Sequence, residues 1–124
     1  MTTAVSVDLR APARLTIYLA QGASGTVEVT VTDANGNPFD LTDYEITYRA
    51  ETPTAITKTV GGGITVGDPP SGVFDIVFEP EDTASLTIEG VRSFTHECRI
   101  EGASGAIYAI FTGTLVVQET LFTA

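Results

Sequence analysis

A histidine and a cysteine two positions apart are the residues of this sequence whose types could carry nucleophilic chemistry. His96 and Cys98 belong to one alternating segment, so both side chains fall on the same face of a strand. A catalytic Cys–His pair needs hydrogen-bond contact and a third group that orients the base. Residues two apart on a strand are separated by about 7 Å along the backbone. The neighbours on that face, Phe94 and Ile100, predict a core position, and two ligands are too few for zinc.

Residues 33–37, with Asp40 and Asp43 nearby, are rich in the oxygen donors that calcium favours. Gly36 stands at the fourth place of this segment, whereas a helix–loop–helix calcium loop requires glycine at the sixth. Asx residues are also typical of hairpin turns that hold no metal. We therefore expect no metal site and no cofactor.

The remaining polar residues form no catalytic pattern. Carboxylates are dispersed, and the adjacent Glu81 and Asp82 are explained by a helix start, where acids complement the helix dipole. Ser24 and Ser104 lie in glycine turns without the surroundings of a nucleophile elbow. We expect no catalytic residues and no enzymatic activity.

Most of the chain alternates apolar and polar residues with a period of two, which predicts strands with one buried face. Only residues 80–86 look helical, with proline at the start and acids in the first turn. The pattern predicts an all-β fold, an antiparallel two-sheet Ig-like β-sandwich with one short helical crossover, or alternatively a partly closed β-barrel. The expected strands are residues 5–10, 15–20, 26–32, 44–51, 56–60, 64–66, 73–79, 91–101 and 106–118.

Two turns have specific signals. Asn35-Gly36 is a strong short-hairpin sequence, because both residues tolerate positive φ. Residues 102–105, Gly-Ala-Ser-Gly, predict a hairpin that joins the last two long strands as neighbours.

Length and charge narrow the function classes. The 124 residues suit a single domain, residues 1–124, with extended termini at about 1–4 and 120–124. A net charge of −10 with six scattered basic residues argues against binding nucleic acid or an anionic membrane. The first residues lack the order of a signal peptide, and no apolar run approaches the roughly 20 residues of a membrane span. Synthesis in a cytoplasm is expected.

The last strand is apolar on both predicted faces. Tyr108, Ile110 and Val116 alternate with a second apolar set that runs from Ile107 to Val117. Such a strand is either central and covered on both sides, or has one face buried by another subunit. We take Tyr108, Ile110 and Val116 as candidate interface residues and expect Ile110 or Val116 to contact a neighbouring chain.

Residues 29–38, VTVTDANGNP, followed by 40–46, DLTDYEI, resemble the β-sandwich modules of tailed-bacteriophage virion proteins. The nearest likeness is to the N-terminal modules of baseplate upper proteins and their small stand-alone relatives, where a D-x-x-G-x-P hairpin precedes D-L-T-G-x. Here Asp43 replaces the usual glycine. The resemblance extends over about residues 15–119.

The resemblance implies a non-enzymatic virion protein, assembled in the host cytoplasm, that docks onto other structural proteins in repeated copies. The length favours a small adaptor of the tail or baseplate, or alternatively a capsid decoration protein. A carbohydrate or cell-surface binding module is a further alternative, based on the acidic surface and the tyrosines.

Overall fold

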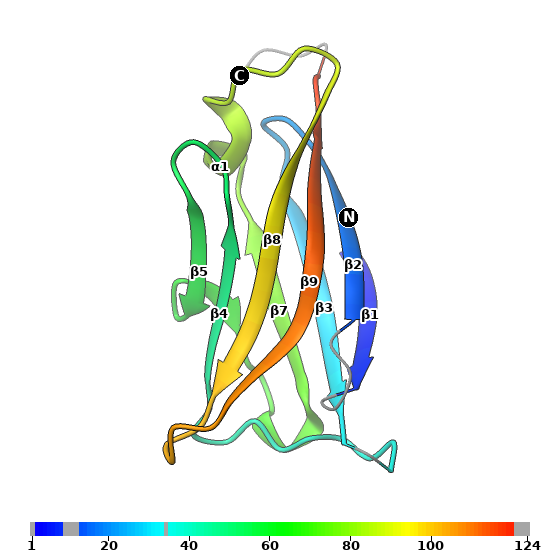
Figure 1. Ribbon diagram of the computed structural model, residues 1–124, viewed down its shortest axis with the longest axis vertical. Coiled ribbons are helices and arrows are strands. Elements are labelled where there is room, and N and C mark those ends of the chain that lie inside the picture. Colours follow the sequence, from blue (N-terminus) through cyan, green and yellow to red (C-terminus); the bar gives the residue numbers. More distant parts are fainter. Residues whose placement is uncertain (1, 9–12, 34, 121–124) are drawn as a thin grey trace.

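The computed structural model describes residues 2–8, 13–33 and 35–120, and Figure 1 shows an elongated molecule built almost entirely from strands. The elements are β1 (Thr2–Asp8), β2 (Ala13–Ala20), β3 (Gly25–Thr32), β4 (Glu45–Ala50), β5 (Ile56–Val60), β6 (Gly63–Thr65), a 3₁₀ turn (Pro69–Ser71), β7 (Val73–Phe78), α1 (Pro80–Ala84), β8 (Val91–Glu101) and β9 (Ile107–Gln118).

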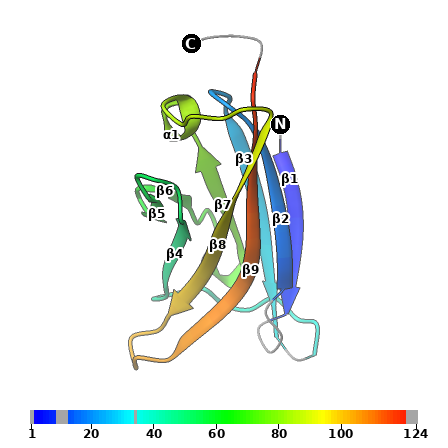
Figure 2. The ribbon, with the colours of Figure 1, turned by 45° about the horizontal axis from the view of Figure 1, so that its top comes forward.

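The nine strands form one hydrogen-bonded sheet in the order β1-β3-β7-β6-β5-β4-β8-β9-β2. Its two end strands, β1 and β2, lie side by side in Figures 1 and 2, so the sheet is nearly closed on itself. The all-β fold with a short helical crossover is confirmed. Of the two expected arrangements, the partly closed barrel describes the hydrogen bonding. The hydrogen-bonded link from β7 to β5 is narrow, because β6, which lies between them, pairs through two residues with each neighbour.

The end strands pair in parallel, unlike most of the sheet. β1 runs parallel to β3, and β2 runs parallel to β9. The long pairs β3–β7, β4–β8 and β8–β9 are antiparallel, as expected. Residues 2–4 do not extend from the body as the sequence suggested, because they pair with residues 26–28 of β3. Residues 9, 10 and 121–124 of the expected elements lie outside the described residues.

The alternating residues fill the interior as predicted. Val27, Val29 and Val31 of β3 are buried, and so is every second residue of β8 from Phe94 to Ile100. The hairpin at residues 102–105 joins β8 to β9 as expected. The Asn35-Gly36 turn is only local: Thr32 bridges to Pro38, but β3 and β4 are not neighbours in the sheet. A turn sequence reverses the chain without determining which strands later pair.

The short helix α1 lies at one end of the barrel, beside the turn between β2 and β3 (Figures 1 and 2). Thr83 is buried and its Oγ1 accepts a hydrogen bond from Gly22 N at 2.8 Å. Asp82 Oδ2 lies 2.7 Å from Lys58 Nζ of β5 and accepts a hydrogen bond from Glu79 N at 2.8 Å. The Lys58 side chain is only 10% exposed, so this ion pair is well shielded from water.

We expect Asp82→Ala to lower the free energy of unfolding by about 2 kcal/mol, between the values typical of exposed and buried ion pairs. The change leaves the Lys58 ammonium, on a side chain that is only 10% exposed, without its partner and removes the acceptor of Glu79 N. Urea denaturation measures the difference. Glu81→Ala is the matched control, since Glu81 is exposed on the same helical turn, and its effect should stay below about 0.5 kcal/mol. Equal effects of the two substitutions would contradict the role of the ion pair.

Candidate docking face

A β-bulge in β9 decides where the three candidate interface residues point. Cys98 pairs with Phe111, but the next residue of β8, Arg99, pairs with Ala109, so Ile110 is an extra residue. Two consecutive residues, Ile110 and Phe111, are therefore both buried. The bulge reverses which residues face inward along β9, which explains why the sequence looked apolar on both sides.

The expectation that Tyr108, Ile110 and Val116 share one face is therefore wrong. Ile110 is 0% exposed in the chain's own core. Tyr108 is half-buried and its ring lies 6.5 Å from that of Phe39. Val116 lies beyond the bulge on the outer side, between Ser93 of β8 and Tyr18 of β2. An interface role for these residues stays a prediction, and among them Val116 is the one placed on the outer surface.

Around Val116 the outer surface of β8, β9 and β2 carries no charge over three aligned rows. The register places Thr95, Thr114 and Thr16 in one row, Ser93, Val116 and Tyr18 in the next, and Val91, Gln118 and Ala20 in the third. We call these nine residues the uncharged face. Tyr18 is 67% exposed and Val91 59% exposed, which places two of the four large exposed hydrophobic residues among the described ones here.

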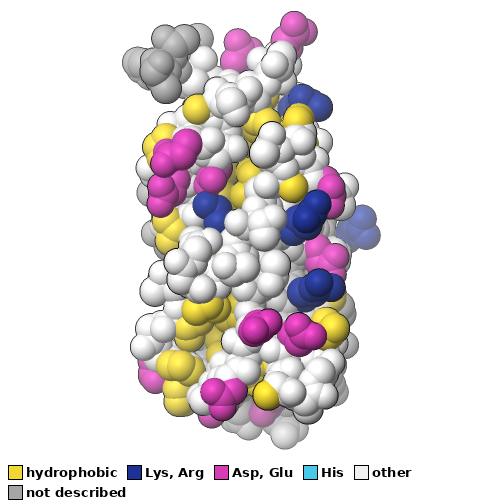
Figure 3. All heavy atoms as spheres, turned by 90° about the vertical axis from the view of Figure 1, so that its left-hand side faces the viewer, with side chains coloured by type: hydrophobic (Ala, Val, Ile, Leu, Met, Phe, Trp, Pro, Cys, Tyr) yellow, Lys and Arg dark blue, Asp and Glu magenta, His cyan; other side chains and the backbone are white. Residues whose placement is uncertain are grey.

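Charged side chains occur on neighbouring parts of the surface. The next row below the uncharged face contains Glu97 and Arg14. Figure 3 shows the side formed by β4, β5 and α1, where acidic and basic side chains are scattered over the whole height of the molecule. Sequence reasoning missed Tyr18 and Val91 as members of a surface. The signal was present as three strand segments whose alternate, outward residues carry no charge, but their adjacency depends on the pairing of β2 with β9.

His96 and Cys98 are both buried in the interior of the protein. His96 is 1% exposed, and its Nδ1 lies 2.9 Å from Tyr48 Oη. Its Nε2 lies 2.8 Å from the Leu15 carbonyl oxygen of β2. Since a carbonyl can only accept, Nε2–H donates to Leu15 and Nδ1 accepts from the Tyr48 hydroxyl. Both ring nitrogens are thus engaged within the protein.

Burial shifts the pKa values of this cluster toward the neutral forms. It lowers the pKa of His96, partly opposed by the hydrogen bond to Leu15. Burial, assisted by Cys98, raises the pKa of Tyr48. It also raises the pKa of the Cys98 thiol, with a smaller contribution from Glu97, so the thiol stays protonated and unreactive. The cluster supplies packing and hydrogen bonds, and its ring contacts extend to Phe111 at 5.2 Å.

The oxygen-rich loop uses its carboxylates to close turns. Asp33 Oδ1 accepts hydrogen bonds from Asn35 N and Asn37 N. The pKa of Asp40 is lowered mainly by a hydrogen bond from the Thr42 hydroxyl, and secondly by one from the Thr42 backbone N–H. Asp43 has φ 64°, and within the described part of the chain it is the one residue other than glycine with positive φ. That backbone conformation gives a physical reason for glycine at this place in the motif that the sequence resembles.

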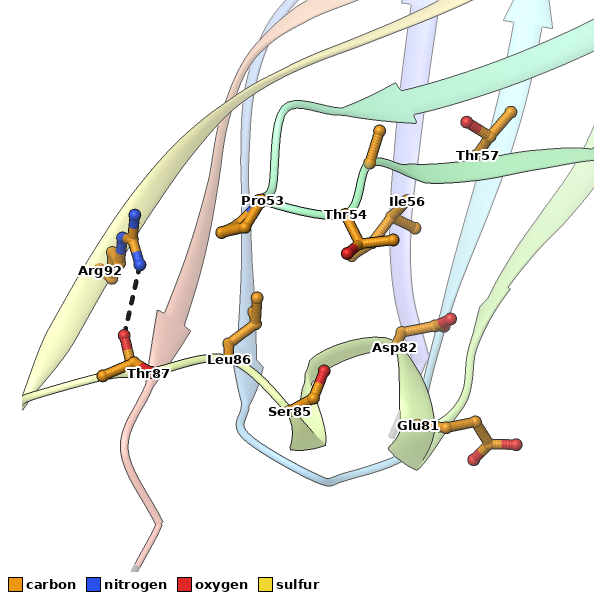
Figure 4. A pocket seen from close by; sticks show the side chains of 11 residues that line it. Pro53, Thr54, Ile56, Thr57, Glu81, Asp82, Ser85, Leu86, Thr87 and Arg92 are labelled. Carbon is orange, nitrogen blue, oxygen red and sulfur yellow. Dashed lines mark hydrogen bonds between the residues drawn. The ribbon is translucent and has the colours of Figure 1, made fainter.

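A groove of about 440 Å³ lies between α1 and the turn from β4 to β5 (Figure 4). Its charged residues are Glu81, Asp82 and Arg92. Asp82 is already paired with Lys58, and Arg92 donates a hydrogen bond to the Thr87 carbonyl at 3.3 Å. The Asp82 and Arg92 side chains thus bond to segments that border the groove. Within the described residues, no cluster of three or more potential metal ligands occurs.

Comparison with known proteins identifies a shared fold. No protein-family model matches the chain, and no curated protein matches it. Among solved structures, the N-terminal domain of phage TP901-1 ORF48 superposes with a TM-score of 0.52 at 14% sequence identity. The match covers 96% of this chain and 98% of that domain. In the described residues, no helix is both long enough and apolar enough to span a membrane.

Proposed function

We propose that this protein is a non-enzymatic structural component of a bacteriophage virion, a small adaptor that docks onto other tail or baseplate proteins. The observation that carries the proposal is the fold shared with a phage protein domain over nearly the full length of both chains. The sequence motifs at residues 29–46 point to the same group of proteins.

The chemistry of the interior supports a non-enzymatic role. His96 has both ring nitrogens bonded inside the protein, and Cys98 is 0% exposed with a raised thiol pKa. The net charge of −10 supports protein partners over nucleic acid or an anionic membrane. We propose that the chain is present in repeated copies in the particle, after assembly in the host cytoplasm.

Mass spectrometry of purified particles, separated into capsid and tail fractions, tests the proposal. We expect peptides of this chain in the tail fraction at a fixed ratio to other tail proteins. Recovery only with capsids would favour a decoration protein, and absence from intact particles would overturn a virion role.

Deletion of the gene followed by complementation tests the non-enzymatic part. A Cys98→Ala copy should restore particle assembly as well as the natural sequence does, because the thiol contributes packing and no chemistry. A folded Cys98→Ala protein that fails to restore assembly would argue for a role of the thiol itself.

A further inference from the structure

We infer that the uncharged face binds a second copy of this chain. The inference rests on the proposed function and deepens it, because it names the surface through which repeated copies meet. Each copy carries a net charge of −10, so two copies repel one another wherever acidic surfaces approach. The uncharged face, by contrast, presents nine residues without a carboxylate or a basic group. Two copies can make contact there without opposing like charges.

The register gives the face a geometry that suits a two-fold axis. Val116 stands at the centre, with Ser93 on one side and Tyr18 on the other. An axis parallel to β9 through Val116 places Val116 of the two copies in contact. The same axis places the exposed Tyr18 ring of each copy above the small Ser93 side chain of the other. The arrangement is isologous, with each residue meeting its complement twice.

The composition of the face also suits contact between proteins. Tyr18 and Val91 leave 67% and 59% of their surfaces exposed, and covering them with a second copy removes apolar surface from water. Nine residues are fewer than the 20–30 per side of a standard interface, so the pair should be weak in isolation. We expect a dissociation constant on the order of 10 µM to 1 mM. In a particle, simultaneous contacts would strengthen such a pair.

Sedimentation of the full chain over this concentration range tests the inference. We expect reversible dimers whose affinity rises several-fold between low and high salt, because salt screens the repulsion between the acidic surfaces. Val116→Glu should weaken dimerisation at least tenfold. The control is Val60→Glu on β5, which adds the same charge at a position that is 50% exposed and away from the face, and should leave dimerisation unchanged. A monomer at all concentrations, or equal effects of both variants, would overturn the inference and leave the face to another protein.

Cysteine cross-linking tests the orientation with milder substitutions. The natural Cys98 is 0% exposed, so an introduced thiol reacts without competition while the protein is folded. A mixture of Ser93→Cys and Tyr18→Cys copies should form disulfide-linked heterodimers, whereas Thr57→Cys on β5, another exposed position, should not pair with either. Dimers in sedimentation without Ser93–Tyr18 cross-links would overturn the arrangement. Both tests use the isolated protein, so they can fail even where particle analysis succeeds.

Discussion

Gly113→Ala should lower the free energy of unfolding by about 3–5 kcal/mol, the largest effect of any single substitution that we predict. Gly113 has φ 141°, a conformation that side chains disfavour. A Cβ atom there would lie only 2.2 Å from the Leu15 carbonyl oxygen, which is backbone of the paired strand β2. The added atom therefore pushes β2 away and disturbs the hydrogen bond between His96 and Leu15.

Urea denaturation and amide hydrogen exchange measure this prediction. Gly67→Ala is the control, because no atom lies within 4 Å of its added Cβ and its φ is ordinary; its effect should stay within about 0.5 kcal/mol. Amides of β2 should lose more protection in Gly113→Ala than amides of β3. Unchanged stability with β2 fully protected would contradict the close approach of the two strands.

Lowering the pH from about 7.5 to 5 should destabilise the natural protein through His96, by up to about 1.4 kcal/mol per pH unit. Burial lowers the pKa of His96 in the folded chain below its ordinary value of 6.5, so the unfolded chain binds the proton more readily. The stability contribution is complete above pH 6.5 and declines as the pH falls toward the folded pKa. A protonated ring would also place a donor at Nδ1, where the Tyr48 hydroxyl now donates.

His96→Gln separates this effect from the titration of carboxylates. His96 is the only histidine of the chain. The free energy of unfolding of the variant should therefore change less between pH 7.5 and 5 than that of the natural protein. At pH 7.5 it should be less stable than the natural protein by about 1–2 kcal/mol, because the two hydrogen bonds are disturbed. A variant that retains the full slope in this window would show that another group is responsible.

Periodicity predicted the strands well but not how they pair. Alternation places Phe94, His96 and Cys98 on one buried face whatever the neighbouring strand is. The parallel pairing of β1 with β3 and of β2 with β9 depends on tertiary packing of distant segments, which no local pattern encodes. For the same reason, the core position of His96 was predictable, whereas its bonds to Tyr48 and Leu15 were not.

The candidate interface was harder to predict because of one residue. The bulge at Ile110 inserts an extra position into β9, and every residue after it changes face relative to those before it. Counting by twos from Tyr108 to Val116 crosses that position and joins an inward residue to an outward one. The positive φ of Asp43, by contrast, agrees with its position in the motif, where glycine is usual.

The pairing of β2 with β9 also has a consequence for how the protein matures during synthesis. β2 is the second strand of the sheet to be translated, whereas its partner β9 is the last. Until then the nascent chain holds a strand with no partner, exposed to contact with other unfinished chains. Topologies dominated by such distant pairings fold slowly, so the pairing of β2 with β9 should be a late event in folding.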